Sequence, residues 1–107
     1  MTQAKMARLE EVATFIGGST PSRANQAHFG GTIPWVKTTD LNNGLITRTE
    51  ETLTEPGLAN SSCKIVPKEA VLVAMYGGFN QIGRTGLLAM PSAINQALTA
   101  VLPDREQ

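Results

Sequence analysis

The sequence has only one cysteine and one histidine among its 107 residues. A single cysteine excludes an internal disulfide framework and a cysteine-based zinc site. Cys63 and His28 lie far apart along the chain, so we do not expect them to act as a nucleophile and its base. We expect Cys63 to be a small residue where a helix meets a strand, and His28 to be a solvated loop residue.

The chain also lacks an excess of charge of either sign and any long hydrophobic run. Nine Lys and Arg residues balance nine Asp and Glu residues, so no global field draws the molecule to nucleic acid or to a membrane surface. No apolar run approaches the roughly 20 residues that span a bilayer. Glu10 and Glu11 stand where a signal peptide would carry its apolar stretch. We therefore expect a cytoplasmic protein with no membrane partner.

Groups arranged for catalysis are equally scarce. The neighbouring glutamates Glu50 and Glu51 project in different directions on either a helix or a strand. The Gly77-Gly78 pair lacks the lysine and the strand–loop–helix order of a phosphate-binding loop. We predict no catalytic residue, no cofactor and no metal, and hence a protein that is not an enzyme. A small nuclease or hydrolase is the least favoured alternative, which incubation with DNA and a divalent metal would test.

The composition that is present favours one small domain rich in short strands. With 41% hydrophobic and 17% charged residues the chain can form a core, and its length suits a single domain over residues 1–107. Ten glycines and six prolines favour many short strands over a few long helices. The exception is a helical spacing of apolar residues from Met6 to Ile16. Because residues 14–16 are better strand formers, we expect that helix to end near Ala13.

Short strands and one short helix are expected after that segment. Thr54 is the expected N-cap of the helix, followed by an acid and a proline in its first turn. The apolar run 70–75 predicts a central strand covered on both faces, and Asn43-Gly44 predicts a turn with positive φ. We expect Trp35 in the core or in a wall of the site. The expected strands cover residues 33–37, 45–53, 64–66, 71–75, 82–89 and 97–102.

Two stretches of the chain carry a local excess of positive charge. Residues 17–48 and residues 60–102 each hold three cations against one acid, an excess of two charges in each stretch. The remaining acids gather at residues 10–11, 50–55 and 104–106. The cations are Arg23, Lys37 and Arg48 in the first stretch and Lys64, Lys68 and Arg84 in the second, against Asp40 and Glu69.

Amides and hydroxyls lie between these cations, and the mixture suits the reading of DNA bases. Arg and Lys pair with guanine and Asn and Gln with adenine, whereas hydroxyls and loop N–H groups hold phosphates. The alternative is that the polar loops are merely solvated. We predict that loops 18–28, 37–44 and 76–84 converge on one face of a sheet and bind DNA. The candidate residues are Thr20, Ser22, Arg23, Lys37, Thr38, Thr39, Asn42, Asn43, Tyr76, Phe79, Asn80, Gln81 and Arg84.

The cations lead this set of candidates. Arg23, Lys37 and Arg84 come first, because nothing else about their loops explains a cation there. The two aromatic residues and Gln81 of the glycine-flanked loop 76–84 come second.

Nine short motifs follow one another along nearly the whole chain. They are Leu9-Glu10-Glu11-Val12, Gly18-Ser19-Thr20-Pro21-Ser22, Ile33-Pro34-Trp35-Val36-Lys37-Thr38-Thr39-Asp40-Leu41, Thr54-Glu55-Pro56-Gly57-Leu58, Ser61-Ser62-Cys63-Lys64, Val66-Pro67-Lys68, Val71-Leu72-Val73-Ala74-Met75-Tyr76-Gly77, Ile82-Gly83-Arg84 and Asn95-Gln96-Ala97. In this order they resemble a target recognition domain of the type I restriction–modification DNA specificity subunit (HsdS), over about residues 8–103. No single motif is diagnostic, and the resemblance rests on their order.

The resemblance implies an α+β fold with a twisted, barrel-like, mostly antiparallel sheet and short helices. It also implies a sequence-specific DNA-binding module that reads a half-site for separate methylation and restriction subunits and has no catalytic activity. The partners implied are double-stranded DNA and the methyltransferase (modification) and restriction subunits of a type I system. A homodimer or pairing with another half-subunit would complete such a reader.

The chain also departs from the family's pattern. Family members usually carry two such domains separated by long helices, whereas this chain has one domain and no heptad-like helix after Leu102. We therefore expect that the C-terminal part of the domain and the spacer helix are missing, whether the chain is a natural half-subunit, a remnant or a trimmed fragment. The alternative function is a non-catalytic interaction protein that docks on a methyltransferase or on a full-length specificity subunit and regulates it.

Overall fold

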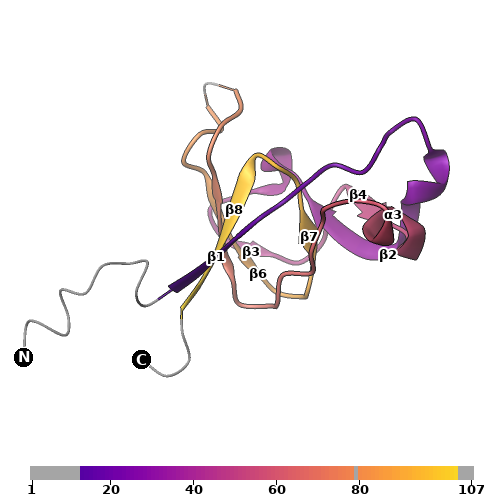
Figure 1. Cartoon of the computed structure of the whole chain (residues 1–107). Helices are drawn as coiled ribbons and strands as arrows, with labels where there is room; N and C mark the ends of the chain where they lie inside the picture. Colours follow the sequence, from indigo (N-terminus) through magenta and orange to yellow (C-terminus); the bar gives the residue numbers. More distant parts are fainter. Residues whose placement is uncertain (1–12, 79, 104–107) are drawn as a thin grey trace, which may run out of the picture.

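The computed structural model of the chain describes residues 13–78 and 80–103 (Figure 1). The helix expected from Met6 lies largely outside the described residues. Where that helix would continue, the chain instead forms strand β1 (Ala13–Gly17), which pairs antiparallel with β8 (Leu98–Pro103). Residues 14–16 prefer an extended backbone, and pairing with β8 satisfies their main-chain hydrogen bonds. Residues 14–16 are therefore part of a strand, as their strand-forming preference indicates.

Strand β1 is one edge of a five-stranded sheet with the order β1-β8-β5-β6-β3. β5 (Val71–Ala74) lies in the middle and pairs antiparallel with both β8 and β6 (Thr85–Leu88). β3 (Leu45–Ile46) forms the other edge through a parallel pairing with β6. The central position predicted for the strand over 71–75 is confirmed, whereas the strand expected at 82–89 is shorter than predicted.

A second sheet has three strands in the order β4-β2-β7. β2 (Phe29–Val36) pairs antiparallel with β4 (Glu51–Leu53) and parallel with β7 (Ala93–Ile94). The single strand predicted over 45–53 is therefore wrong. Its two ends belong to different sheets, and residues 47–50 cross from one sheet to the other.

The fold is mixed α+β, with mostly sheet and few short helices. Four of the six pairings among the described strands are antiparallel and two are parallel. The two sheets do not close into a barrel, so the expected barrel-like shape is not supported. The smaller sheet and helix α3 (Glu55–Ala59) lie at one end of the molecule, and the larger sheet lies at the other (Figure 1). Within the described ranges, no helix is long and apolar enough to cross a membrane.

Helix α3 begins where the sequence predicts. Thr54 Oγ1 accepts a hydrogen bond from the main-chain N–H of Gly57 at 3.1 Å, and the same hydroxyl donates to the carbonyl of Ala27 at 2.6 Å. The second bond ties α3 to the 3₁₀ helix η1 (Gln26–His28). The strand expected over 64–66 is reduced to an isolated bridge between Val66 and Ser92.

The core is divided between the two sheets. The larger cluster packs under the five-stranded sheet and includes Leu72, Leu88 and Leu98, while a smaller one surrounds Trp35, which is 1% exposed. Burial along β5 alternates, because Leu72 and Ala74 face the core while Val71 is 40% exposed. The prediction that this strand is covered on both faces is therefore wrong, since its second face is open to solvent.

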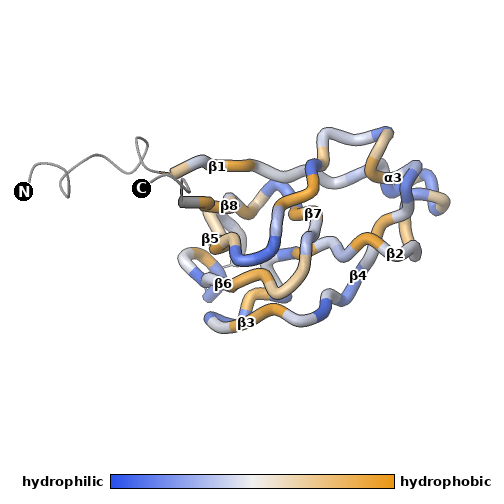
Figure 2. The backbone as a smooth tube through the Cα atoms, turned by 90° about the horizontal axis from the view of Figure 1, so that it is seen from below, coloured by the Kyte–Doolittle hydropathy of each residue, from blue (hydrophilic) through white to orange (hydrophobic). Residues whose placement is uncertain are grey.

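That open face carries a row of apolar side chains across all five strands. In register the row consists of Phe15, Val101, Val71, Leu87 and Leu45. Four of them are exposed, from 40% at Val71 and Leu87 to 54% at Leu45, and Val101 is half-buried. The hydrophobic segments of β1, β6 and β3 can be followed in Figure 2. We call this row the outer apolar row.

Candidate nucleic-acid interface

Two of the three loops predicted to bind DNA meet directly. Arg84, at the base of the hairpin between β5 and β6, donates from Nη1 to the carbonyl of Leu41 at 3.5 Å and from Nη2 to the carbonyl of Asn80 at 3.3 Å. The guanidinium thus bridges loop 37–44 and loop 76–84. Both acceptors are neutral main-chain carbonyls. No carboxylate of the described residues forms an ion pair with Arg84, so its charge is not neutralised there.

The turn at Asn42 and Asn43 strengthens this junction. Asn43 adopts the predicted positive φ of 58°, and its Oδ1 accepts a hydrogen bond from the main-chain N–H of Thr85 at 2.9 Å. Asn42 Oδ1 accepts from the N–H of Gly44 at 2.8 Å, and its Nδ2 donates to the carbonyl of Leu45 at 3.2 Å. Both amides therefore shape the turn, which takes up part of their capacity to bond to a base.

The tip of the hairpin projects beyond the larger sheet (Figure 1). Tyr76 is 52% exposed and Asn80 is exposed as well. The half-buried Gln81 accepts a hydrogen bond at Oε1 from the main-chain N–H of Gly78 at 3.0 Å, which fixes the turn. Phe79 lies outside the described residues. The tip thus presents an aromatic ring and an amide to solvent beside Arg84.

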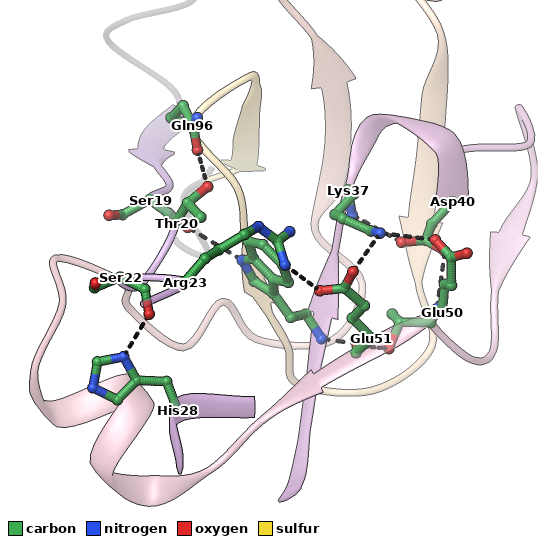
Figure 3. A network of polar contacts seen from close by, with 12 residues as sticks. Ser19, Thr20, Ser22, Arg23, His28, Lys37, Asp40, Glu50, Glu51 and Gln96 are labelled. Carbon is green, nitrogen blue, oxygen red and sulfur yellow. Dashed lines mark hydrogen bonds and ion pairs between the residues drawn. The ribbon is translucent and has the colours of Figure 1, made fainter. Parts of the chain in front are cut away.

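A cluster of ion pairs occupies the other two predicted cations. Lys37 Nζ lies 2.7 Å from Glu50 Oε1 and 3.1 Å from Glu51 Oε2, and Arg23 Nη1 lies 3.2 Å from Glu51 Oε1 (Figure 3). We call these four residues the ion-pair cluster. The local positive excess predicted for residues 17–48 is therefore cancelled in part, because two acids that follow this stretch in the sequence return to it in space.

The ion-pair cluster shifts the pKa of two of its members. Partial burial disfavours the charge on Lys37, but hydrogen bonds and attraction from Glu50 and Glu51 outweigh it and raise the pKa above its ordinary value. Partial burial likewise disfavours the charge on Glu51, but Lys37 and then Arg23 outweigh it and lower the pKa of that carboxyl. Both groups are thus held in their charged forms.

Arg23 also rests on an aromatic surface. Its guanidinium carbon lies 5.1 Å from the ring centroid of Phe29 and 5.3 Å from that of Trp35, within the range of a cation–π interaction. Trp35 is fixed in turn, because its Nε1 donates to the carbonyl of Ser19 at 3.1 Å. Trp35 is therefore a buried wall that positions Arg23, as expected, and it is not a platform for a DNA base.

Asp40 connects loop 37–44 to the ion-pair cluster through the main chain. Its Oδ2 accepts from the N–H of Lys37 at 2.9 Å and its Oδ1 accepts from the N–H of Glu50 at 3.1 Å. These bonds fix the 3₁₀ helix η2 (Thr38–Asp40). Within it Thr38 is buried and Thr39 is exposed, so only Thr39 presents its side chain to solvent.

The first loop is held by contacts of its own. Thr20 donates a hydrogen bond from its hydroxyl to Gln96 Oε1, and the carbonyl of the exposed Ser22 lies 3.0 Å from Nδ1 of His28. His28 is 5% exposed, so the prediction of a solvated histidine is wrong. The imidazole is buried because its contact with the Ser22 carbonyl holds it against the start of loop 18–28. Cys63 is also buried, and its Sγ donates to the carbonyl of Ser19 at 3.1 Å rather than to an imidazole.

The structure thus arranges the predicted residues in two connected groups. Loops 37–44 and 76–84 join around Arg84, and loop 18–28 joins loop 37–44 through the shared carboxylate of Glu51. Sequence reasoning missed Glu50 and Glu51 as members of the site. No group of His, Cys, Asp and Glu within the described ranges could hold a metal ion.

Comparisons with known proteins converge on one family. The family model for the type I restriction modification DNA specificity domain matches residues 1–107. The specificity subunit of the type I restriction enzyme HindI from Haemophilus influenzae is 30% identical over 104 residues, covering 96% of this chain and 22% of the relative. The specificity subunit of EcoR124I/EcoR124II from Escherichia coli is 30% identical over 98 residues, covering 89% of this chain and 24% of the relative.

Solved structures of low sequence identity share the fold. The HsdS subunit from Thermoanaerobacter tengcongensis superposes with a TM-score of 0.72 at 20% identity, covering 94% of this chain and 24% of that one. A chain from work on complex assembly and conformational transition of the type I R-M system gives a TM-score of 0.65 at 19% identity, with the same two coverages of 94% and 24%. This chain therefore spans less than a quarter of the length of each of these proteins.

Proposed function

The chain belongs to the type I restriction modification DNA specificity domain family, and on that premise we propose that it reads the sequence of a DNA half-site through Arg84 and the two loops that Arg84 joins. The named relatives are specificity subunits, which agrees with the expectation of a recognition component rather than an enzyme. The reading unit is residues 1–107 acting as one target recognition domain. Its proposed place of action is the cytoplasm, where bacteria and archaea keep their DNA.

The observation that carries this proposal is the environment of Arg84. Its guanidinium is held by two neutral carbonyls, forms no ion pair with another described residue, and has further N–H donors to offer. An arginine fixed in this way suits bidentate pairing with guanine, which discriminates against a wrong base by about 1–3 kcal/mol. The exposed Tyr76 and Asn80 and the half-buried Gln81 beside it supply an aromatic ring and amides to neighbouring positions.

The test is a titration of labelled duplex DNA with the full chain at several salt concentrations, after selecting the preferred duplex from a random pool. We expect Arg84→Ala to weaken binding to the selected duplex by about tenfold or more and to relax sequence preference. Lys68→Ala is the matched control, because Lys68 is an exposed cation outside the three loops. Equal losses for the two variants, or no duplex binding by the chain at low salt, would refute the proposal.

A second proposed role is protein docking through the outer apolar row. An exposed apolar strip on a sheet is typical of a surface that another protein covers. The proposed partner is the methyltransferase subunit of a type I system, with the restriction subunit joining that assembly. A second copy of the chain, or another half-subunit, is the competing occupant. Docking on a methyltransferase or on a full-length specificity subunit would also serve the alternative regulatory function.

A pull-down with the methyltransferase subunit and a measurement of solution mass distinguish these occupants. Val71→Lys places a charge in the middle of the outer apolar row, whereas Ser62→Lys places the same charge on an exposed residue outside that row. We expect only Val71→Lys to abolish capture, with duplex binding unchanged. A dimer that Val71→Lys converts to a monomer would favour the second copy. Capture that both variants retain would refute docking at this row.

A further inference from the structure

The ion-pair cluster is built around a single carboxylate that serves two recognition loops. Glu51 Oε1 contacts Arg23 in loop 18–28, and Glu51 Oε2 contacts Lys37 at the start of loop 37–44. Glu50 adds a second anionic contact to Lys37. One acid therefore pairs with the two leading cations of the predicted DNA-binding set, while the third, Arg84, has no carboxylate partner among the described residues.

A DNA phosphate offers the same chemistry as this carboxylate. Both present paired anionic oxygens that accept charge-assisted hydrogen bonds from Arg and Lys. The geometry around Glu51 keeps the cations in place without it, because Arg23 lies over Phe29 and Trp35, and Lys37 is fixed by its main-chain bond to Asp40. A hollow of about 420 Å³, lined in part by Arg23, Glu50 and Glu51, opens beside the Arg23–Glu51 ion pair. A phosphate therefore has room to approach.

We propose that Glu51, assisted by Glu50, is an internal competitor that occupies Arg23 and Lys37 until a DNA phosphate displaces it, and so limits the affinity for DNA of any sequence. The inference rests on the proposed DNA-reading function and adds a competitor built into the same site. The Arg23–Glu51 contact is the more easily displaced one, because ion pairs between solvent-exposed side chains contribute little to stability, whereas the side chain of Lys37 is only 18% exposed. The side chain of Arg23 is 56% exposed and that of Glu51 is 32% exposed.

This competition sets a threshold of affinity that every duplex must pass. Phosphate contacts carry most of the affinity for random DNA, so a carboxylate that must first be displaced penalises every duplex equally. Only a duplex whose bases also satisfy Arg84 and the hairpin tip gains enough base contacts to offset that penalty. The ratio of the two affinities is unchanged, because discrimination is a difference of binding free energies, but at a given protein concentration random DNA falls below the affinity at which it is bound.

The experiment compares Glu51→Gln, Glu50→Gln and a control, Glu55→Gln, in the full chain. Glu55 lies in the first turn of α3, is exposed, and forms no ion pair in the described part of the chain, so its substitution changes the net charge equally without freeing a cation. The probe is a labelled duplex of random sequence, titrated from about 0.05 to 0.2 M salt. The duplex selected on the wild-type chain is titrated in parallel.

We expect Glu51→Gln to bind the random duplex about tenfold more tightly than Glu55→Gln does near 0.1 M salt. The slope of log K against log salt should steepen by about 0.9 for each freed cation that gains a phosphate. Affinity for the selected duplex should rise by a similar factor, because the released cations meet phosphates in either duplex. Glu50→Gln should act in the same direction with a smaller effect, since Glu50 contacts Lys37 alone.

The outcomes separate this inference from the proposed function. If the chain binds duplex through Arg84 but Glu51→Gln and Glu50→Gln match Glu55→Gln in affinity and slope, the competitor role is wrong and DNA reading stands. If no variant binds duplex at any salt concentration, both fail. Binding by Glu51→Gln alone supports both. Near-ultraviolet circular dichroism of Trp35 checks folding, and if Glu51→Gln does not fold, the highly exposed Glu50→Gln decides.

Discussion

Glu51 lies opposite Trp35 in the antiparallel pairing of β2 with β4. Residues that face each other in such a pair project from the same side of the sheet, and so does Lys37, two positions beyond Trp35. The side chains of Trp35, Glu51 and Lys37 therefore lie on the same side of the β2–β4 pair. The register of β2 against β4, rather than any local motif, brings Glu51 to its cations.

The ion-pair cluster predicts how stability responds to pH. The pKa of Glu51 is lowered below its ordinary value of 4.5, so the stabilisation it contributes is present above pH 4.5 and is lost as the pH falls through the lowered value. The pKa of Lys37 is raised above 10.5, so its contribution is present below pH 10.5 and is lost as the pH rises through the raised value.

Urea unfolding at a series of pH values measures this response. We expect Glu51→Gln to lose less stability than the wild type does between pH 5 and pH 3, because the variant has no carboxylate at this position to protonate. Glu55→Gln serves as the control, because it removes one negative charge but no ion pair among the described residues. Its free energy of unfolding should change with pH as that of the wild type does. Parallel pH profiles for the wild type and Glu51→Gln would show that the cluster contributes nothing to folding.

Much of the fold follows from local chemistry in the sequence. The Thr54 cap, the left-handed turn at Asn43 and the central strand near Val71 depend on a few neighbouring residues, and all three are confirmed. The split of residues 45–53 between two sheets was not predicted, because alternation reports which residues are half-buried but not which strand they pair with. The pairing partners of β3 and β4 lie far away in the sequence.

The same limit explains what sequence reasoning missed at the site. Residues 17–48 contain only one acid to oppose Arg23 and Lys37, because Glu50 and Glu51 follow this stretch in the sequence. In space, both acids return to these cations. His28 was expected in solvent because its neighbours are polar, yet it is buried against Ser22. Ion pairs and burial depend on tertiary contacts, which local composition does not encode. The role of the predicted residues in DNA binding stays a prediction.

Asn43 combines a conformational role with a predicted recognition role, and substitutions separate the two. We expect Asn43→Ala to lower the free energy of unfolding by about 1–2 kcal/mol, because alanine resists the left-handed backbone that the turn requires and the bond to Thr85 is lost. Asn43→Gly should cost less, since glycine adopts positive φ freely. Urea unfolding followed by circular dichroism measures both, and equal losses would contradict the conformational argument.

The recognition role of Asn43 is tested with Asn43→Asp in the duplex titration. Aspartate retains the oxygen that accepts from Thr85 and tolerates positive φ, but it replaces an amide donor with a negative charge. If this side chain faces DNA, duplex binding should fall while the free energy of unfolding stays near that of the wild type. Unchanged duplex binding would remove Asn43 from the DNA-binding set and leave it a role in the turn alone.

The neighbouring glycines Gly17 and Gly18 give a test of how the Arg23 loop is anchored. A Cβ at Gly18 would lie 2.2 Å from the carbonyl oxygen of Ile94 and 2.3 Å from that of Asn95, whereas a Cβ at Gly17 would meet nothing within 4 Å. Ser19, the next residue, donates its N–H to the same Ile94 carbonyl at 3.0 Å. Gly18 therefore permits the loop to pack against β7 before it turns toward Arg23.

We expect Gly18→Ala to lower the free energy of unfolding by about 1–3 kcal/mol, because a backbone has to shift to admit the methyl group. Gly17→Ala should stay within about 0.5 kcal/mol of the wild type, as an exposed substitution into open space. Because the shift would move Arg23 away from Glu51, Gly18→Ala should also change the near-ultraviolet circular dichroism of Trp35, on which Arg23 rests. Equal stability of the two variants in urea would mean that the loop is not held against β7, and the position of Arg23 would then need another anchor.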